Sequence, residues 1–389
     1  MTDNSHVRAV HDEGDESWRY QKVLERKRMN TTSKPAAANS ATANFFERFT
    51  RTDGTKRYVL GVNPYAEAVA RVAPVDGFID EYTTLTTWLG KPVLRLNQID
   101  KDSMVVSAVT NSRPKTGVEK LKAAGVKEVM DYFAFADLSN GSVPQLECIT
   151  DMRKEHASNS AKFEWIRGLL IDDESRQVFD DILRFRLEAN LAAIEKYDFC
   201  VDRQYFEPFV VFSEGEVFVD GGGFDGFTSL EFAKRCPGYG SIHFFEPGSD
   251  TLVLAKENMR NLHNVNYHLL GLFDRNTTLS FSSGDGSASH ISEDGDVKIE
   301  VATLDSVVNE PVSFIKLDLE GAEIAALTGM KQHILDDHPK LAVAVYHYPS
   351  DFWTIPEYIL SLRSDYRIYL RHYTEGWAET IMFFIPVAD

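Results

Sequence analysis

Residues 217–228 read VFVDGGGFDGFT, an apolar run that ends in an acid and continues into a glycine-rich turn. The apolar run predicts a buried strand, and the glycines allow the backbone to turn tightly before a helix begins. A strand, a glycine turn and a helix in this order are typical of nucleotide-cofactor loops in doubly wound α/β folds. The alternative is a purely structural turn that binds no ligand.

The acid at the start of this turn bears on the type of cofactor. A dinucleotide-binding turn reads G-x-G-x-x-G, whereas here Asp220 stands before Gly222 and Gly226. A carboxylate at this position would repel a pyrophosphate, but it suits the ammonium group of an amino acid. The turn therefore favours S-adenosylmethionine over a dinucleotide, and Phe224 and Thr228 are further candidate cofactor contacts.

The next predicted strands carry acids at their carboxyl ends. Glu246 ends the strand about 20 residues after the glycine turn, where an acid accepts hydrogen bonds from both ribose hydroxyls in folds of this type. Alternatively, Glu246 is only a solvated strand end. Asp318 ends a later strand and is expected where the methionine end of the cofactor meets the acceptor. Glu320 and Glu323 follow it, either as functional acids or as stabilisers of the next helix N-terminus.

A histidine follows the strand at 341–346. A neutral imidazole at His347 is a candidate base for a hydroxyl proton, because the ordinary pKa of histidine lies near working pH. Asp318 and Glu320 are its rivals, and His372 is a second histidine candidate. The nearby acids are ligands that magnesium prefers, but they can converge only if the chain bends in a way that the sequence does not reveal. No metal is therefore predicted.

The wider pattern predicts four parts. We expect a flexible tail at 1–50, a small α/β domain at 51–140, a helical connector at 141–210 and a second α/β domain at 211–389. The strands predicted for the last part cover residues 217–220, 242–246, 265–269, 314–318, 341–346, 366–369 and 381–385.

Bulk composition narrows the classes of partner and location. The 389 residues carry a formal net charge of −18, which disfavours non-specific binding to nucleic acid or anionic lipid. The three cysteines are widely spaced, which argues against a disulfide framework or a structural zinc site and favours a reducing cytoplasm. A basic start followed by an apolar run is not seen, and no stretch approaches about 18 uninterrupted apolar residues. We expect neither secretion nor membrane insertion.

Residues 174–384 resemble the FkbM-type methyltransferases. The likeness is carried by VFVDGGGFDGFTS, FFEP, FIKLDLEGAE, LAVAVYHYPSDFWTIPEYI and YLRHYTEGWAETIMF, with DDESRQVFDDILRFRL ahead of the domain. The resemblance implies a Rossmann-like fold and O-methylation of sugars or other hydroxyls. It further implies that Asp220, Gly222 and Gly226 line the methionine and ribose, that Glu246 holds the ribose diol, and that Leu270, Gly271 and Leu272 flank the adenine. Many members have a small residue and Asn where this chain has Gly223 and Phe224.

The first α/β part is similar to the N-terminal nucleotide-sugar-binding domain of bacterial sugar acyltransferases. Its first turn, at residues 61–65, lacks the glycine-rich form that admits a phosphate. This part is therefore expected either to bind a nucleotide sugar, to act as a docking or scaffold module, or to be a spacer that shapes the acceptor site.

These observations predict an α/β protein with a C-terminal Rossmann-like class I methyltransferase domain of mixed, mostly parallel sheet. A smaller Rossmann-like α/β domain and a helical connector precede it. The expected function is S-adenosylmethionine-dependent O-methylation of a sugar, nucleotide-linked sugar or glycan, with a small-molecule or saccharide acceptor; an oligomer is compatible with the sequence. A nicotinamide-dependent sugar oxidoreductase or epimerase should carry G-x-G-x-x-G and a Tyr-x-x-x-Lys pair, and neither is present. The presence of Asp220, Glu246 and Asp318 argues against a non-catalytic nucleotide-binding protein.

Overall fold

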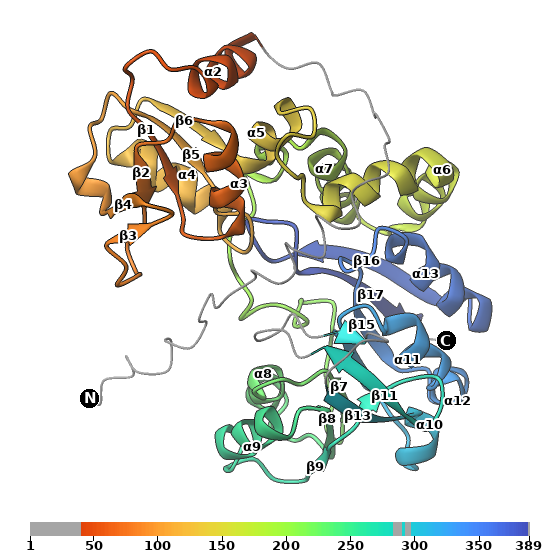
Figure 1. Ribbon diagram of the computed structural model, residues 1–389. Coiled ribbons are helices and arrows are strands. Elements are labelled where there is room, and N and C mark those ends of the chain that lie inside the picture. The colour runs from red at the N-terminus through yellow and green to blue at the C-terminus, as the bar shows by residue number, and fades with distance from the viewer. Residues whose placement is uncertain (1–39, 283–289, 292–296, 388–389) are drawn as a thin grey trace. The chain divides into compact units, whose positions relative to one another are not determined.

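The computed structural model describes residues 40–282, 290–291 and 297–387, and these divide into two compact units. Of the described residues, 40–153, 181–199 and 374–377 form the first unit, and all others form the second unit. Residues 1–39 of the tail predicted at 1–50 lie outside the described residues. Figure 1 shows the elements of both units in chain order by colour.

The first unit is built on a mostly parallel sheet. Its strand order is β3-β4-β2-β1-β5-β6, and β1 lies between β2 and β5, parallel to both. Strands and helices alternate along this unit, as an α/β unit requires. The elements are β1 (Arg57–Leu60), α3 (Pro64–Val72), β2 (Gly77–Ile79), β3 (Thr87–Trp88), β4 (Lys91–Leu94), η1 (Leu96–Gln98), β5 (Met104–Ser107), α4 (Pro114–Ala123), β6 (Glu128–Asp131), α5 (Tyr132–Leu138) and η2 (Leu191–Ile194).

A helix occupies the last part of the segment predicted as a tail. Helix α2 (Ser40–Thr50) buries Phe45 and Phe49, whose rings stack 5.6 Å apart, and Phe49 meets the edge of Phe135 on α5. The prediction of a tail as far as residue 50 is therefore wrong for residues 40–50. Phenylalanines at helical spacing give this segment an apolar face, and burial of that face stabilises the helix despite the polar residues around it.

The segment predicted as a helical connector forms two long helices. Helices α6 (Glu147–Leu169) and α7 (Asp173–Glu188) confirm its helical character, and α6 is kinked at Asn159, where φ is −131°. Both helices contribute residues to each of the two units, so the connector is not a separate body. The apolar positions of α7 recur every three or four residues and are buried, which explains why the helix is held by packing.

The second unit contains the larger sheet. Its strand order is β16-β17-β15-β14-β7-β8-β9, with β17 antiparallel to both neighbours and the other pairs parallel. This confirms the mixed, mostly parallel Rossmann-like sheet. The strands are β7 (Val217–Gly221), β8 (Ser241–Phe245), β9 (Val265–His268), β14 (Phe314–Leu317), β15 (Lys340–Ala344), β16 (Tyr366–His372) and β17 (Thr380–Pro386). The chain runs from β7 outward to β9 and then returns to β14 on the other side of β7. Ligands bind outside the carboxyl ends of strands at such a reversal.

Helices cover this sheet, and a smaller sheet is added to it. Figure 1 shows α8 (Phe227–Arg235) and α9 (Ser249–Asn258) on one side of the strands and α11, α12 and α13 on the other. The latter are α11 (Glu323–Thr328), α12 (Lys331–Asp336) and α13 (Asp351–Leu362); α10 (Leu304–Val307) precedes β14. The small sheet has the strand order β10-β13-β11-β12 and was not expected from the sequence. Its strands are β10 (Gly271–Leu272), β11 (Thr277–Ser282), β12 (His290–Ile291) and β13 (Val297–Ala302).

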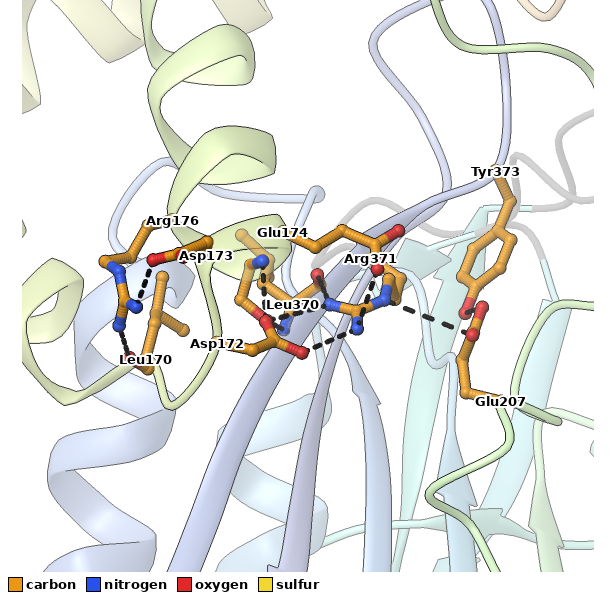
Figure 2. Close-up of polar contacts among 10 residues, drawn as sticks. Leu170, Asp172, Asp173, Glu174, Arg176, Glu207, Leu370, Arg371 and Tyr373 are labelled. Carbon is orange, nitrogen blue, oxygen red and sulfur yellow. Dashed lines mark hydrogen bonds and ion pairs between the residues drawn. The ribbon is translucent and has the colours of Figure 1, made fainter.

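An ion cluster centred on Arg371 of β16 ties the start of α7 to this sheet (Figure 2). The Arg371 side chain is buried, and its Nη2 atom lies 2.8 Å from Asp172 and 3.1 Å from Glu174. Its Nη1 atom donates a hydrogen bond of 2.8 Å to Ser175, and its Nε atom lies 4.0 Å from Glu207. The acids of the DDES stretch thus hold α7 against the last strands of the second unit.

In the part of the chain that the structure describes, none of the helices combines the length and the apolar character that crossing a membrane requires.

Candidate active site

The glycine turn after β7 lies against two neighbouring strands. Gly222 has a φ of +71°, and a Cβ atom there would lie 2.0 Å from the carbonyl oxygen of Asp318. The N–H groups of Gly222 and Gly223 both donate to the carbonyl of Phe245, at 3.1 and 3.0 Å. Gly226, with a φ of +87°, is the N-cap of α8. Close approach and left-handed backbone therefore explain why this turn requires glycine.

Asp220 lies below the turn and not on its surface. Its carboxylate is fully buried, with Oδ1 3.2 Å from Lys316 Nζ and Oδ2 accepting from the Ser229 hydroxyl at 2.7 Å. Lys316 also donates to the carbonyls of Gly221 and Gly222. The ammonium group of Lys316 thus lies beside this carboxylate, and the contact of Asp220 with the cofactor stays a prediction. Asp220 and Lys316 together brace the turn from inside.

Glu246 links the tip of β8 to the glycine turn. Its carboxylate accepts hydrogen bonds from the backbone N–H of Phe224, at 3.1 Å, and of Gly248, at 2.8 Å. Burial raises the pKa of Glu246 above its ordinary value, although both N–H groups act in the opposite direction. Phe224 has a φ of 50° and is 37% exposed. The structure thus brings Glu246 to the turn that precedes it by about 20 residues, as the spacing predicts; its contact with ribose stays a prediction.

The residues expected around the adenine lie in the small sheet. Gly271 and Leu272 form β10, and a Cβ atom on Gly221 would lie 3.0 Å from Leu272 Cδ1. Leu272 is buried against the glycine turn, while Leu270 and Gly271 are half-buried. Thr228, in the first turn of α8, is also half-buried. Leu272 therefore packs beside the glycine turn, where the adenine is expected. Its contact with adenine stays a prediction.

Asp318 follows β14 at the same edge of the sheet and is held by two tyrosines. Its Oδ2 atom accepts a hydrogen bond of 2.8 Å from the Tyr205 hydroxyl, and its Oδ1 atom accepts one of 3.1 Å from Tyr346. Burial is the main reason that the pKa values of both tyrosines lie well above the ordinary value, so both hydroxyls remain donors. Sequence reasoning missed Tyr205.

A left-handed bend gathers the acids that follow Asp318. Glu320 has a φ of 53° and Gly321 a φ of 95°, which turns the chain back so that Glu323 can begin α11. The Glu323 side chain is 1% exposed and accepts a hydrogen bond of 2.7 Å from the backbone N–H of Leu319. This is the bend that the sequence did not reveal, because a glutamate rarely adopts a positive φ. Asp318, Glu320 and Glu323 therefore converge.

His347 lies among these three acids. Its Nε2 atom is 3.5 Å from Asp318 Oδ1 and 3.4 Å from Glu320 Oε2, and its Nδ1 atom is 3.1 Å from Glu323 Oε1. Burial lowers the pKa of His347, but the carboxylates outweigh it and hold this pKa well above the ordinary value. This arrangement favours the charged form of the imidazole, and the role of His347 as a base stays a prediction.

The second candidate histidine has a different setting. His372 lies in β16, and its Nδ1 atom is 2.9 Å from the Thr380 hydroxyl on the neighbouring strand. Both side chains are buried. This arrangement is typical of a histidine that satisfies a hydrogen bond within a sheet.

Glu379 is a further acid that the sequence analysis did not single out. It precedes β17 with a φ of 64°, and its Oε2 atom accepts a hydrogen bond from Gln204, which also donates to the Tyr205 hydroxyl. Burial, followed by the charge of Asp318, raises the pKa of Glu379 to about 7. The acid therefore belongs to the same hydrogen-bonded group as Asp318. In the sequence, Glu379 was marked only by its place in YLRHYTEGWAETIMF, one of the stretches that carry the family resemblance.

The raised pKa of Glu379 predicts a pH-dependent stability. Between its ordinary value of 4.5 and about 7, the folded chain holds a proton that the unfolded chain releases. The free energy of unfolding should therefore fall as pH rises through this window, by about 3 kcal/mol in total. A Glu379→Gln variant, which lacks the titrating group, should gain stability relative to the wild type from pH 5 to pH 8 in urea unfolding. The exposed Glu357→Gln change is the control, and parallel profiles for wild type and Glu379→Gln would contradict the assignment.

In the first unit, the side chain of Asn63 closes the turn at residues 61–65. Asn63 caps α3 by accepting from the Ala66 N–H at 2.9 Å and donates to the Ala108 carbonyl at 3.0 Å. Pro64, the first residue of the helix, has no N–H to offer. These features reduce the donors available to a phosphate at this turn.

Comparisons with known proteins agree with the geometry of the second unit. A family model described as "Methyltransferase FkbM domain" matches residues 220–374. The structure of a methyltransferase FkbM from Methylobacillus flagellatus KT is similar with a TM-score of 0.69 and 21% identity, covering 94% of this chain and 97% of that chain. An rRNA methylase from Streptococcus thermophilus (TM-score 0.31, 14% identity) covers 56% of this chain and 99% of its own. Aeropyrum pernix fibrillarin with natively bound S-adenosyl-L-methionine (TM-score 0.30, 12% identity) covers 48% of this chain and 71% of its own. No curated protein matches the chain.

The matched range begins at Asp220 and includes Glu246, the acids after β14 and His347. The glycine turn and the acid cluster described above therefore lie within one recognised domain, and the likeness to the Methylobacillus structure shows the same fold over most of the chain. The chain carries a methyltransferase domain of the FkbM family.

Proposed function

We propose that this protein is an S-adenosylmethionine-dependent O-methyltransferase that acts on a hydroxyl of a sugar, a nucleotide-linked sugar or a glycan. The observation that carries this proposal is the convergence of Asp318, Glu320 and Glu323 at the carboxyl end of β14, beside the glycine turn. S-adenosylmethionine binds at the turn, with its ribose on Glu246. The three cysteines are free, which fits a reducing cytoplasm.

The reaction makes two demands on the protein. The acceptor oxygen attacks the methyl carbon, the carbon–sulfur bond breaks, S-adenosylhomocysteine leaves, and the hydroxyl proton passes to a base. The sulfonium already activates the methyl group, so the protein has to align the oxygen and remove its proton.

Glu320 is the base in this proposal. Burial raises its pKa, which brings the carboxylate closer to working pH, and its side chain remains 31% exposed at the sheet edge. Asp318 is oriented by Tyr205 and Tyr346, and it accepts a hydrogen bond from the acceptor. Neighbouring carboxylates of this kind suit a polyol, because ionised acids only accept hydrogen bonds and adjacent hydroxyls donate them.

Calorimetric titration of the full chain with S-adenosylhomocysteine tests the cofactor assignment. A Glu246→Gln variant should bind at least about tenfold more weakly, because a charge-assisted hydrogen bond to a ribose hydroxyl is lost. Glu257→Gln is the matched control and should bind as the wild type does; Glu257 lies on α9, and its exposed side chain pairs with Arg260 beyond the end of that helix. Equal affinities for all three proteins would remove the cofactor site proposed for Glu246.

Incubation with methyl-labelled cofactor and a panel of nucleotide sugars tests the acceptor class. Labelled product is expected, and Glu320→Gln should lower its rate by about 100-fold or more while leaving S-adenosylhomocysteine affinity unchanged. If no nucleotide sugar is labelled, the acceptor has to be sought among glycans and secondary metabolites. Full activity of Glu320→Gln would exclude this residue as the base.

A further inference from the structure

The acid cluster has the composition of a cation site. Asp318, Glu323 and His347 each offer one ligand atom, and these atoms all lie within 4.8 Å of one another. Opposite ligands of an octahedral Mg²⁺ or Mn²⁺ are about 4.2 Å apart, given bonds of about 2.1 Å. The three side chains come from the end of β14, the start of α11 and the end of β15, so the fold itself brings them together.

Polar atoms in the cluster lack the hydrogen bonds that buried groups normally make. His347 is 8% exposed, yet neither of its ring nitrogens has a hydrogen-bond partner, although carboxylate oxygens surround it. The Oε2 atom of Glu323 is also buried without a partner. Buried polar atoms are almost always satisfied, so atoms of this kind that face one another indicate a missing ligand.

The charges of the cluster also require a cation. Three carboxylates surround one imidazole, so even a protonated His347 offsets only one of their three negative charges. The nearby Lys316 does not correct this, because it is paired with Asp220 under the glycine turn. Uncompensated buried charge is costly, and a divalent cation offsets it.

The neighbours of Asp318 leave it ready to act as a ligand. Tyr205 holds the Oδ2 atom at 2.8 Å, while Oδ1 accepts from Tyr346 and lies 3.5 Å from His347 Nε2. Second-sphere hydrogen bonds of this kind fix the orientation of metal-binding carboxylates. Glu320, with Oε2 3.4 Å from His347 Nε2, is placed on the same side of the ring as Asp318.

We infer that Asp318, Glu323 and His347 bind a hard divalent cation, Mg²⁺ or Mn²⁺, at the carboxyl edge of the second unit's sheet. Oxygen ligands predominate in the set, which favours these ions over softer metals. The cation binds the neutral imidazole and so displaces its proton. Its role, which rests on the proposed function, is to hold the acceptor hydroxyl and favour loss of its proton.

Electron paramagnetic resonance of Mn²⁺ tests the site without any measurement of activity. Full-length protein is treated with EDTA, transferred to chelator-free buffer and titrated with MnCl₂, and loss of the free Mn²⁺ signal reports binding. We expect one site per chain, and at least about tenfold weaker binding for Glu323→Gln, which keeps the oxygen that accepts from Leu319. The exposed Glu257→Gln change removes the same charge elsewhere and should bind as the wild type does.

Thermal unfolding shows whether each variant is folded. Without metal, Glu323→Gln and Asp318→Asn should unfold at the same or a higher temperature than the wild type, because each removes one repelling charge. Added Mn²⁺ should raise the unfolding temperature of the wild type and leave that of both variants unchanged. An undiminished free Mn²⁺ signal with wild-type protein, or equal binding by Glu323→Gln, overturns the inference.

The outcomes also separate this inference from the proposed function. If S-adenosylhomocysteine binds and methyl transfer proceeds after chelation with no Mn²⁺ bound, the cation site is refuted and the methyltransferase proposal stands. If Mn²⁺ binds at these residues but the chain binds no S-adenosylhomocysteine, the cation site stands and the proposed function is refuted.

Discussion

An Arg371→Leu variant is expected to lose about 3 kcal/mol of unfolding free energy at pH 7, because it leaves the acids around Arg371 without their cation. The guanidinium is buried and contacts Asp172 and Glu174, with Glu207 at 4.0 Å (Figure 2). We place the loss at the lower end of the range for buried ion pairs because Asp172 and Glu174 retain access to water. Urea unfolding followed by circular dichroism measures it.

Arg367→Leu is the matched control, because Arg367 lies on the same strand but is exposed, and its replacement should change stability by about 0.5 kcal/mol or less. The pH dependence gives a second check. Burial would raise the pKa of Asp172, but Arg371 and Ser175 outweigh it and hold this pKa at about 2. This stabilisation is present above the ordinary pKa and disappears as pH falls toward about 2, so the deficit of Arg371→Leu should shrink in acid. A constant deficit would show that lost packing dominates.

A Gly222→Ala variant is expected to lose about 3 kcal/mol or more of stability and to bind S-adenosylhomocysteine at least about tenfold more weakly. The added methyl group would lie 2.0 Å from the carbonyl oxygen of Asp318, at a residue whose φ of +71° already disfavours alanine. Relief requires the turn to move away from β14, and this turn is the proposed cofactor contact. Urea unfolding and calorimetric titration measure the two effects.

Gly215→Ala separates backbone strain from steric clash. Gly215 has a φ of +82° in the same unit, but a Cβ atom there meets nothing within 4 Å. This control should lose only about 1 kcal/mol, from the left-handed backbone alone, and should bind S-adenosylhomocysteine normally. Equal losses for the two variants would mean that the close approach of Gly222 to Asp318 does not matter.

Much of the second unit could be predicted from local patterns. The strand at 217–221, its glycine turn and the spacing to Glu246 follow from short-range rules on buried strands and tight turns. Strands β8, β14, β15 and β17 were found because consecutive residues in them are buried and they therefore appear as largely apolar runs. By contrast, β10 and β12 of the small sheet are only two residues long, and such short segments carry little periodic signal.

The sequence by itself determined the type of fold and the side of the sheet on which the site lies, because periodicity and glycine turns act over a few residues. Only the tertiary structure decided what each acid does. Asp220 pairs with Lys316 from a neighbouring strand, and His347 becomes charged because three carboxylates reach it. The bend at Glu320 and Gly321 that brings those acids together is held by contacts between β14, α11 and the segment after β15. Charge state and ligand geometry depend on through-space distances between distant residues, and no local pattern in the sequence contains those distances.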